Sequence, residues 1–380
     1  MDVVIVGGGI TGAIAAYLFS DAGIRVAVVE AKTCGQGSTA ASTALLMQEP
    51  DKDFGDLAAR CGSATARRVW KALMAGTRDL ARTIGTLKID CDFVKRDSVY
   101  FTLDPEKVAH LHKEFRDRKR AGLPGRWSSA ASLHARTGIR AQGAIITSGN
   151  AEVDPVKTCA AFLRRAQDRG VKIFERSPVR RILTSTSSVT VKTPAGVILA
   201  KQVLIATGYA TREFKPLLGR FRLMDTYVIA THRLPGRLRR KALRRRAMLW
   251  DTDRPYHYLR WTNDHRLLVG GEDTPHRSSR GARTRAKEGT ARLRNYLAGV
   301  YPDFALERPE YVWTGVFAET PDGLPYIGTH KRYPKHLFAL GYGGNGMTAS
   351  FLAAKFLLKR YLKSPSPDEA LFAFDRSRKR

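Results

Sequence analysis

The chain contains few cysteines, and their placement excludes two common kinds of site. Four cysteines are spread over 380 residues and form no C-x-x-C pair, so the sequence predicts neither a zinc site nor a redox-active dithiol. So few cysteines favour a reducing, cytoplasmic setting. The sequence also lacks internal repeats and low-complexity linkers. The hydrophobic content of 43% is enough to form a substantial buried core, and a length of 380 residues suits two or three packed units better than one.

Charged side chains are absent from Val3 to Ser20, a run that resembles a signal peptide or a membrane span. Two features oppose this interpretation. Asp2 stands where a signal peptide carries Lys or Arg, and four glycines interrupt the apolar run. We therefore expect neither a targeting segment nor a transmembrane segment.

Acidic residues are in the minority, with 35 Asp and Glu against 65 Lys and Arg and a net charge of +30. Such an excess raises nucleic acid or an anionic membrane surface as a partner. The basic residues fall in separate clusters, the densest at Arg233–Arg246, and none carries the alternating aromatic residues that stack single strands. This distribution favours a solvated basic surface, with a tRNA-binding or lipid-binding surface as the alternative.

The first thirty residues have the pattern of a strand, a glycine turn, an apolar helix and a second strand, which predicts a parallel strand pair. The turn contains Gly7, Gly9 and Gly12 in the order G-x-G-x-x-G, and Glu30 ends the second strand. In this motif the glycines allow a tight turn and close approach of a pyrophosphate to the helix N-terminus. Glu30 lies eighteen residues beyond Gly12, where a carboxylate accepts hydrogen bonds from ribose hydroxyls. The sequence therefore predicts a dinucleotide site.

Three further segments favour FAD over NAD as that dinucleotide. Residues 37–42 (GSTAAS) supply small hydroxyl side chains soon after the acid. Thr207 and Gly208 end a buried strand, where ligands of parallel sheets bind. Residues 341–346 (GYGGNG) open another helix, for which a nicotinamide enzyme has no need.

The order of strands and helices predicts an α/β fold in which a dinucleotide-binding FAD domain is interleaved with an antiparallel-sheet substrate domain. The FAD-binding domain is expected in three parts, at residues 1–90, 143–212 and 319–380. The substrate domain is expected at residues 91–142 and 213–318.

These motifs, together with AEVDP at 151–155 and W-x-G-x-F-A-x-T-P-D-G-L-P-x-I-G at 313–328, resemble in order the D-amino-acid oxidase-like flavoprotein family, which includes glycine oxidase and sarcosine oxidase. The resemblance implies bound FAD, hydride transfer from an amine to flavin N5, and an imine that water then hydrolyses. It also implies a set of FAD-binding residues: Gly7, Gly9, Ile10, Thr11, Gly12, Glu30, Ala31, Lys32, Ser38, Thr39, Val179, Thr207, Gly208, Gly343, Gly344, Asn345, Gly346 and Met347.

Three positions depart from the family pattern. Phe317 stands where glycine oxidase-like members have a carboxylate-binding Arg, which makes a simple α-amino acid a poorer substrate. Gly315 aligns with the flavin-linked Cys of sarcosine oxidase-like members, so noncovalent FAD is expected. Leu268 aligns with their oxygen-activating Lys, which favours an electron acceptor other than oxygen.

The segment Trp250–Trp261 gathers aromatic side chains in the sheet expected to cover the flavin. In a strand Tyr256, Tyr258 and Arg260 share a face, while His257 points away. Tyr258 and Arg260 are therefore candidate catalytic residues that orient the substrate, and the alternative is a packing role at the domain interface.

The resulting hypothesis is an FAD-dependent oxidoreductase that oxidises the C–N bond of a small amine or N-substituted amino acid. Hydride transfer from a neutral amine requires no strong side-chain base, and the sequence contains no obvious acid or base motif. Two alternative functions also involve bound FAD. One is oxidation of a modified nucleoside in tRNA, and the other is a flavin-binding protein with a docking role.

Overall fold

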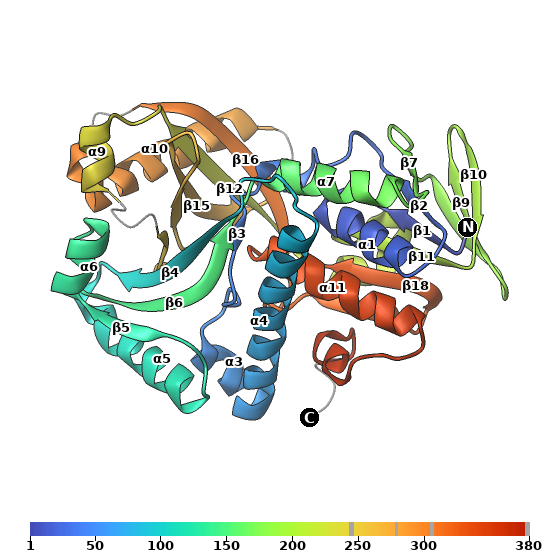
Figure 1. The fold of residues 1–380 in the computed structure, drawn as a ribbon, viewed down its shortest axis with the longest axis horizontal. Helices are drawn as coiled ribbons and strands as arrows, with labels where there is room; N and C mark the ends of the chain where they lie inside the picture. The colour runs from blue at the N-terminus through green and yellow to red at the C-terminus, as the bar shows by residue number, and fades with distance from the viewer. Residues whose placement is uncertain (243–246, 278–279, 305–307, 377–380) are drawn as a thin grey trace.

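The computed structural model describes residues 1–242, 247–277, 280–304 and 308–376. Two units lie side by side, one around a largely parallel sheet at the right of Figure 1 and one around a large mixed sheet at the left. Helix α4 (Ser63–Thr86) runs between them in this view. The predicted α/β class with two interleaved units is confirmed.

A six-stranded sheet forms the centre of the first unit. All its neighbouring strands are parallel except the last pair, and their order across the sheet is β7 (Lys172–Phe174), β2 (Val26–Val29), β1 (Val3–Val6), β11 (Gln202–Gly208), β18 (Tyr333–Leu340) and β17 (Tyr326–His330). The parallel pairing of β1 with β2 confirms the prediction from the first thirty residues.

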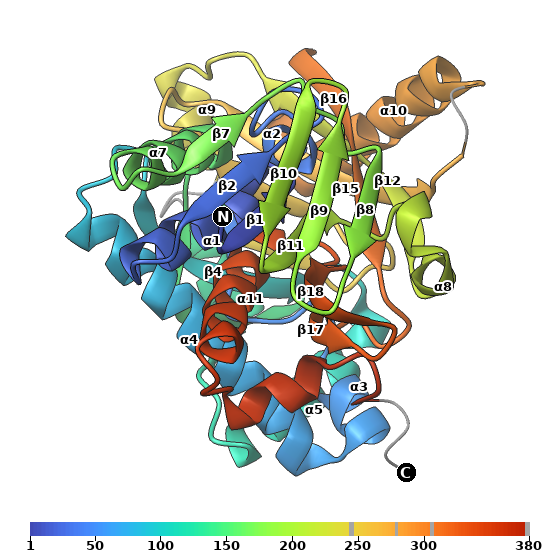
Figure 2. The ribbon, with the colours of Figure 1, turned by 90° about the vertical axis from the view of Figure 1, so that its right-hand side faces the viewer.

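Both faces of this sheet are covered, which explains its continuous apolar strands. On β1, Val3 and Ile5 pack into a core with the helices, whereas Val4 packs into a second core with a small three-stranded sheet. The helices on the first face are α1 (Ile10–Asp21), α7 (Pro155–Gln167) and α11 (Gly346–Tyr361). The small sheet, in front in Figure 2, contains β8 (Arg181–Thr184), β9 (Val189–Thr193) and β10 (Gly196–Ala200).

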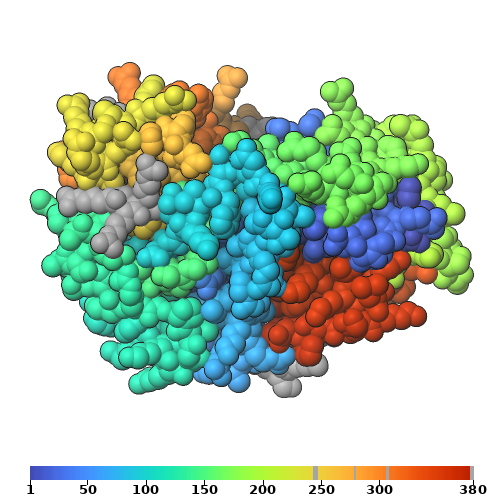
Figure 3. All heavy atoms as spheres, in the orientation of Figure 1, coloured from blue at the N-terminus to red at the C-terminus, as the bar shows by residue number. Residues whose placement is uncertain are grey.

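The contact between α1 and α11 brings an N-terminal and a C-terminal segment of the chain together. Figure 3 shows the N-terminal and C-terminal segments, in blue and red, next to each other on the surface of the first unit. The helical turn η4 (Pro367–Phe372) packs against α4. A glycine turn near residue 345 therefore lies beside one near residue 9, as the predicted cofactor site requires.

A nine-stranded sheet forms the second unit. Along its path the strands are β16 (Pro309–Glu319), β12 (Arg222–Thr231), β15 (Leu267–Pro275), β14 (Tyr258–Trp261), β13 (Met248–Asp251), β4 (Val94–Thr102), β6 (Gly143–Glu152) and β3 (Leu45–Leu46), and β5 (Arg126–Ser129) pairs with β6. Among the described strands of this sheet only β13 and β4 pair in parallel, so the predicted antiparallel character is confirmed.

The remaining helices cover or connect the sheets. They are α2 (Ser38–Ala41), α3 (Phe54–Cys61), α5 (Val108–Arg120), α6 (Ala130–Thr137), α8 (Lys215–Leu218), α9 (Gly236–Lys241) and α10 (Ala282–Val300), with short turns η1 (Pro105–Lys107), η2 (Arg212–Phe214) and η3 (Pro302–Phe304). Leu133 on α6, Leu238 on α9 and Leu293 on α10 pack into one core beneath the large sheet. Within the described ranges, no helix combines the length and apolarity needed to cross a membrane.

Strand β6 shifts one predicted domain boundary. Residues 143–152 were expected to begin the second part of the FAD-binding domain, but they pair with β4 in the large sheet. The chain crosses back only after Glu152, where Asp154 caps α7 by accepting hydrogen bonds from the N–H groups of Val156 and Lys157. We propose the same division into two domains as predicted, except that the second part of the FAD-binding domain begins after Glu152 and not at residue 143.

Candidate functional site

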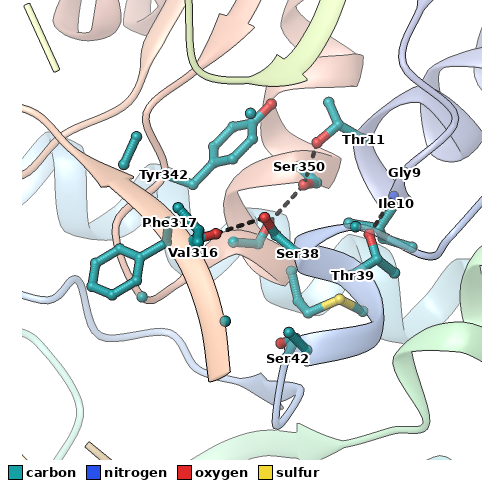
Figure 4. A pocket seen from close by; sticks show the side chains of 18 of the residues that line it. Gly9, Ile10, Thr11, Ser38, Thr39, Ser42, Val316, Phe317, Tyr342 and Ser350 are labelled. Carbon is teal, nitrogen blue, oxygen red and sulfur yellow. Dashed lines mark hydrogen bonds between the residues drawn. The ribbon is translucent and has the colours of Figure 1, made fainter. Parts of the chain in front are cut away.

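A cavity of about 530 Å³ lies between the two sheets. Its walls come from the turn between β1 and α1, the end of β2, residues 37–51, the end of β11, β16 and the turn before α11. The strands of the large sheet contribute residues including Thr226, Trp250 and Tyr258. Figure 4 shows the hydroxyl side chain of Thr39 beside Ile10 in the first turn of α1, and that of Ser38 beside Val316.

The three glycines of the first turn have different neighbours. Gly7 has φ +110°, and a Cβ there would lie 2.5 Å from the carbonyl oxygen of Ala206. A Cβ on Gly12 would lie 1.9 Å from the carbonyl oxygen of Gly7. A Cβ on Gly9 would meet only the Thr39 hydroxyl, at 3.2 Å, and Gly9 lines the cavity. Gly7 and Gly12 therefore allow the chain to pack, whereas Gly9 leaves space for a ligand at the helix N-terminus.

Glu30 is fixed on the cavity wall directly after β2. Its carboxylate accepts hydrogen bonds from the backbone N–H groups of Gly8 and Lys32, both at 2.8 Å. A carboxylate offers about four lone-pair sites, so Glu30 keeps acceptor capacity for sugar hydroxyls. The neighbouring Ala31 and Lys32 also line the cavity.

Side chains that are distant in sequence tie this wall together. The Thr39 hydroxyl accepts from the N–H of Ile10 at 3.0 Å, and the hydroxyls of Thr11 and Ser350 lie 2.7 Å apart, joining α1 to α11. Ser38 donates to the carbonyl oxygen of Val316 at 2.7 Å, which joins α2 to β16. The two units therefore meet directly at the cavity.

The glycine turn before α11 closes the other side. The N–H of Gly344 donates to the Asp51 carboxylate at 2.5 Å. The side chain of Asn345 donates to the carbonyl oxygens of Met47 at 3.1 Å and Glu49 at 2.8 Å. Residues 47–51, which the sequence did not single out, therefore hold this turn in place.

Most residues predicted to bind FAD line this one cavity. They are Gly7, Gly9, Ile10, Thr11, Glu30, Ala31, Lys32, Ser38, Thr39, Val179, Thr207, Gly208, Gly343, Gly344, Asn345, Gly346 and Met347. Gly12 does not line it and acts through packing against Gly7. Tyr258 lines it, as do Gly315 and Phe317.

Arg260 does not reach the cavity. Its guanidinium is buried and donates to the carbonyl oxygens of Thr43, of Trp261 at 3.0 Å and of Val153 at 3.2 Å. The substrate-orienting role predicted for it is therefore wrong, and it supports the backbone near the crossover. The strand itself begins at Tyr258, so Tyr256 lies before it. Regular strand alternation therefore does not place Tyr256, Tyr258 and Arg260 on one face as predicted.

Leu268 also lies away from the cavity, buried in β15. The cavity-lining residue of this strand is Asp273, five positions later. Between them Gly271 and Glu272 have φ of +138° and +57°, and the pairing of β12 with β15 shifts register here. This irregularity changes which side chains face the cavity, so a side chain at position 268 does not act from the cavity wall.

Burial dominates the acid–base behaviour of this part of the cavity. It raises the pKa of Asp273 to about 7, and nearby Glu319 and Asp51 add to the increase. It raises the pKa of Asp51 to about 6, against hydrogen bonds from Gly344, Asn345 and Tyr256 that lower it. Burial also raises the pKa of Tyr258, so its hydroxyl stays neutral at physiological pH.

Comparison with known proteins identifies the family. Residues 2–360 match the family described as FAD dependent oxidoreductase. The chain therefore belongs to this FAD-dependent oxidoreductase family. The chain is 27% identical to gamma-glutamylputrescine oxidoreductase of Escherichia coli (strain K12) over 94% of this chain and 82% of that protein. It is 25% identical to glycine oxidase of Geobacillus kaustophilus (strain HTA426) over 92% of this chain and 89% of that protein.

Solved structures show the same fold. The crystal structure of glycine oxidase from Geobacillus kaustophilus superposes with a TM-score of 0.82 at 22% identity, covering 99% of this chain and 98% of that one. L-proline dehydrogenase from P. horikoshii superposes with a TM-score of 0.81 at 18% identity, covering 99% of this chain and 98% of that one.

The residues present fit FAD. Gly9 leaves a gap at the helix N-terminus, where a side chain would meet Thr39, and such a gap suits a pyrophosphate. Glu30 is oriented by two backbone N–H groups and retains acceptor sites for ribose. The second helix N-terminus, at Gly346, lines the same cavity.

We expect Glu30→Ala to weaken FAD binding by about tenfold without abolishing it, because water partly replaces the lost hydrogen bonds. Titration of the apoprotein with FAD, followed by fluorescence quenching, measures the dissociation constant. Glu30→Gln, which keeps an acceptor oxygen, serves as the matched control and should have a smaller effect. Unchanged affinity in the alanine variant would remove Glu30 from the site.

Proposed function

We propose that the chain oxidises the C–N bond of a small amine to an imine, with noncovalently bound FAD as the oxidant. Bound FAD supplies the acceptor for a hydride from the substrate carbon. The observation that carries this proposal is a single cavity that joins the glycine cradle to Tyr258 and Phe317. The relatives support an amine or amino acid substrate, since one is named gamma-glutamylputrescine oxidoreductase and another glycine oxidase.

The chain itself positions the substrate. Tyr258 lines the cavity as a neutral hydroxyl 3.2 Å from the hydroxyl of Thr226. Its ring lies so close to Gly270 that a Cβ on Gly270 would be 2.3 Å away. Tyr258 is therefore held in one orientation, and we propose it as a catalytic residue that contacts the substrate. Phe317 adds an apolar wall in place of a carboxylate-binding group.

An anaerobic panel of amines and amino acids tests the reaction. We expect bleaching of the flavin bands by at least one amine, followed by release of an aldehyde or ketone after imine hydrolysis. Purified protein that binds no FAD, or bound flavin that no amine reduces, would overturn the proposed function and favour a docking role.

FAD should leave the protein completely on denaturation. Position 315 is a glycine and so offers no thiol for a covalent bond to flavin. None of the four cysteines or nine histidines of the chain lines the cavity. Acid precipitation followed by absorption of the supernatant measures the released flavin. Yellow colour that stays in the washed pellet would contradict noncovalent binding.

The tRNA alternative rests on the net charge of +30. Residues 243–246 of the densest basic cluster, Arg233–Arg246, lie outside the described residues. The acidic side chains in the cavity do not favour entry of a phosphate-bearing nucleoside. Binding to tRNA that falls steeply with salt would support this alternative, because displacement of counterions makes such affinity depend on salt concentration.

A further inference from the structure

The cavity has the opposite charge balance to the chain as a whole. The chain carries a net charge of +30, yet the charged residues that line the cavity are four acids and one base among the described residues. The base, Lys32, lies two residues after Glu30 and lines the cavity beside it. At the other side, Asp51 and Asp273 line the cavity together with tyrosine side chains.

Asp273 has acceptor capacity that the described residues do not use. Its Oδ1 atom is buried and has no hydrogen-bond partner among them. An unpaired buried carboxylate oxygen is costly unless a ligand or water satisfies it. Burial raises the pKa of Asp273, and Glu319 and Asp51 raise it further, whereas Thr226 and His257 lower it.

Two basic residues of the segment Trp250–Trp261, Arg254 and His257, pair with other carboxylates. The Nδ1 atom of His257 lies 2.9 Å from the carboxylate of Asp251, and its Nε2 atom lies 3.1 Å from the carboxylate of Glu272. Arg254 lies 3.8 Å from Asp53 and does not line the cavity. Among the described residues, no Lys, Arg or His forms an ion pair with Asp51 or Asp273, and the one positive charge that lowers the pKa of Asp273, that of His257, is shared with Asp251 and Glu272.

Aromatic rings complete the surroundings of these carboxylates. Tyr256 donates to Asp51 at 3.3 Å, and its ring centroid lies 6.0 Å from that of Tyr258. The ring centroid of Trp250 lies 6.1 Å from that of Tyr256, and both residues line the cavity. Carboxylates combined with ring faces form the chemistry that binds an ammonium group, by ion pairing and cation–π attraction.

We infer that Asp273 and Asp51, with these tyrosines, bind the ammonium group of a cationic aliphatic amine that has no carboxylate on its reacting carbon. The inference rests on the proposed amine oxidation and specifies its substrate class. Asp273 then accepts a proton from the ammonium nitrogen, which leaves the amine neutral for oxidation. The N–H bond breaks, an O–H bond forms on the carboxylate, and the electron pair stays on nitrogen.

Two non-oxidisable probes test the charge preference in the flavin-loaded protein. Tetramethylammonium has no nitrogen lone pair, and acetate carries the opposite charge. We expect tetramethylammonium to perturb the flavin spectrum with at least tenfold higher affinity than acetate. Equal affinities, or tighter binding of acetate, would overturn the inference.

Substitutions at one strand position assign the preference to Asp273. Asp273→Asn should weaken tetramethylammonium binding at least tenfold, and Asp273→Arg should reverse the preference toward acetate. Glu272→Gln is the matched control, because Glu272 is the adjacent acid and bonds with His257 and Arg292 instead of lining the cavity. It should leave binding of both probes unchanged. Flavin content reports whether each variant retains its fold.

The two proposals fail in different ways. If the cationic probe binds through Asp273 but no amine reduces the flavin, the proposed oxidation fails while the charge preference stands. If zwitterionic amino acids reduce the flavin as fast as monoamines and Asp273→Asn binds both probes like the native protein, the substrate class is wrong while the oxidation stands.

Discussion

A Gly9→Val protein is expected to fold and to contain no FAD. Gly9 has φ −77° and ψ −174°, which a β-branched residue adopts readily, so the backbone imposes no penalty. The new Cβ would lie 3.2 Å from the Thr39 hydroxyl, and its methyl groups would enter the cavity at the N-terminus of α1. We expect FAD affinity to fall at least a hundredfold, because a pyrophosphate cannot share that space.

The matched substitution at Gly12 separates ligand binding from folding. A Cβ on Gly12 would lie 1.9 Å from the backbone oxygen of Gly7, which no side-chain movement relieves. Gly12→Val should therefore yield insoluble or unfolded protein, while Gly9→Val retains its circular dichroism spectrum and thermal transition. The ratio of flavin absorption to protein absorption measures occupancy. Normal flavin content in folded Gly9→Val protein would contradict the site.

The cofactor side of the site could be predicted because its determinants are local. Gly7, Gly9, Gly12 and Glu30 fall within one strand, turn, helix and strand unit, whose spacing alone fixes their geometry. The glycine turn before α11 could be predicted for the same reason. Alternation of apolar residues also predicted the antiparallel character of the second sheet.

The substrate side could not be predicted because it depends on long-range packing. Asp51 meets the turn at Gly344, almost three hundred residues away, and no local pattern marks that contact. Asp273 follows a positive-φ irregularity at Gly271 and Glu272, and an assumption of regular strand alternation misplaces every later side chain.

Arg260 illustrates a different difficulty. Sequence pattern placed its side chain on the same face as Tyr258, and a cavity-facing Arg is a reasonable substrate-binding group. The structure instead uses its donors for the backbone carbonyl oxygens of Thr43 and Val153, in two distant loops, and of the neighbouring Trp261. A buried Arg can donate hydrogen bonds to such backbone carbonyl oxygens only when loops that are distant in sequence pack around it. The sequence does not reveal that packing.

Reduced flavin in this protein is expected to react slowly with oxygen and faster with a quinone or an artificial dye. The departure at Leu268 first suggested this, but the cavity gives a stronger reason. Asp51 and Asp273 line the substrate side, and the only basic lining residue among those described is Lys32, on the wall that carries Glu30. Carboxylates beside the flavin destabilise a developing superoxide anion, whereas a cation would stabilise it.

The size of this effect makes it measurable. Two unit charges about 4 Å apart interact with about 4 kcal/mol at an effective dielectric constant of 20. Reversing a charge next to the reacting oxygen therefore changes the rate by orders of magnitude, since each 1.4 kcal/mol is about tenfold. We expect Asp273→Lys to reoxidise in air at least a hundredfold faster than the native protein.

Photoreduction of the flavin separates this test from any question of substrate. The photoreduced protein is mixed with oxygenated buffer or with an anaerobic quinone, and recovery of flavin absorption gives both rates. Glu272→Lys is the matched control, because the same charge change occurs one residue away at a side chain that does not line the cavity. It should alter the oxygen rate far less than Asp273→Lys. Rapid reoxidation of the native protein by oxygen would refute the expected preference for other acceptors. Equal oxygen rates for Asp273→Lys and the control would refute the role of Asp273 in slowing the reaction with oxygen.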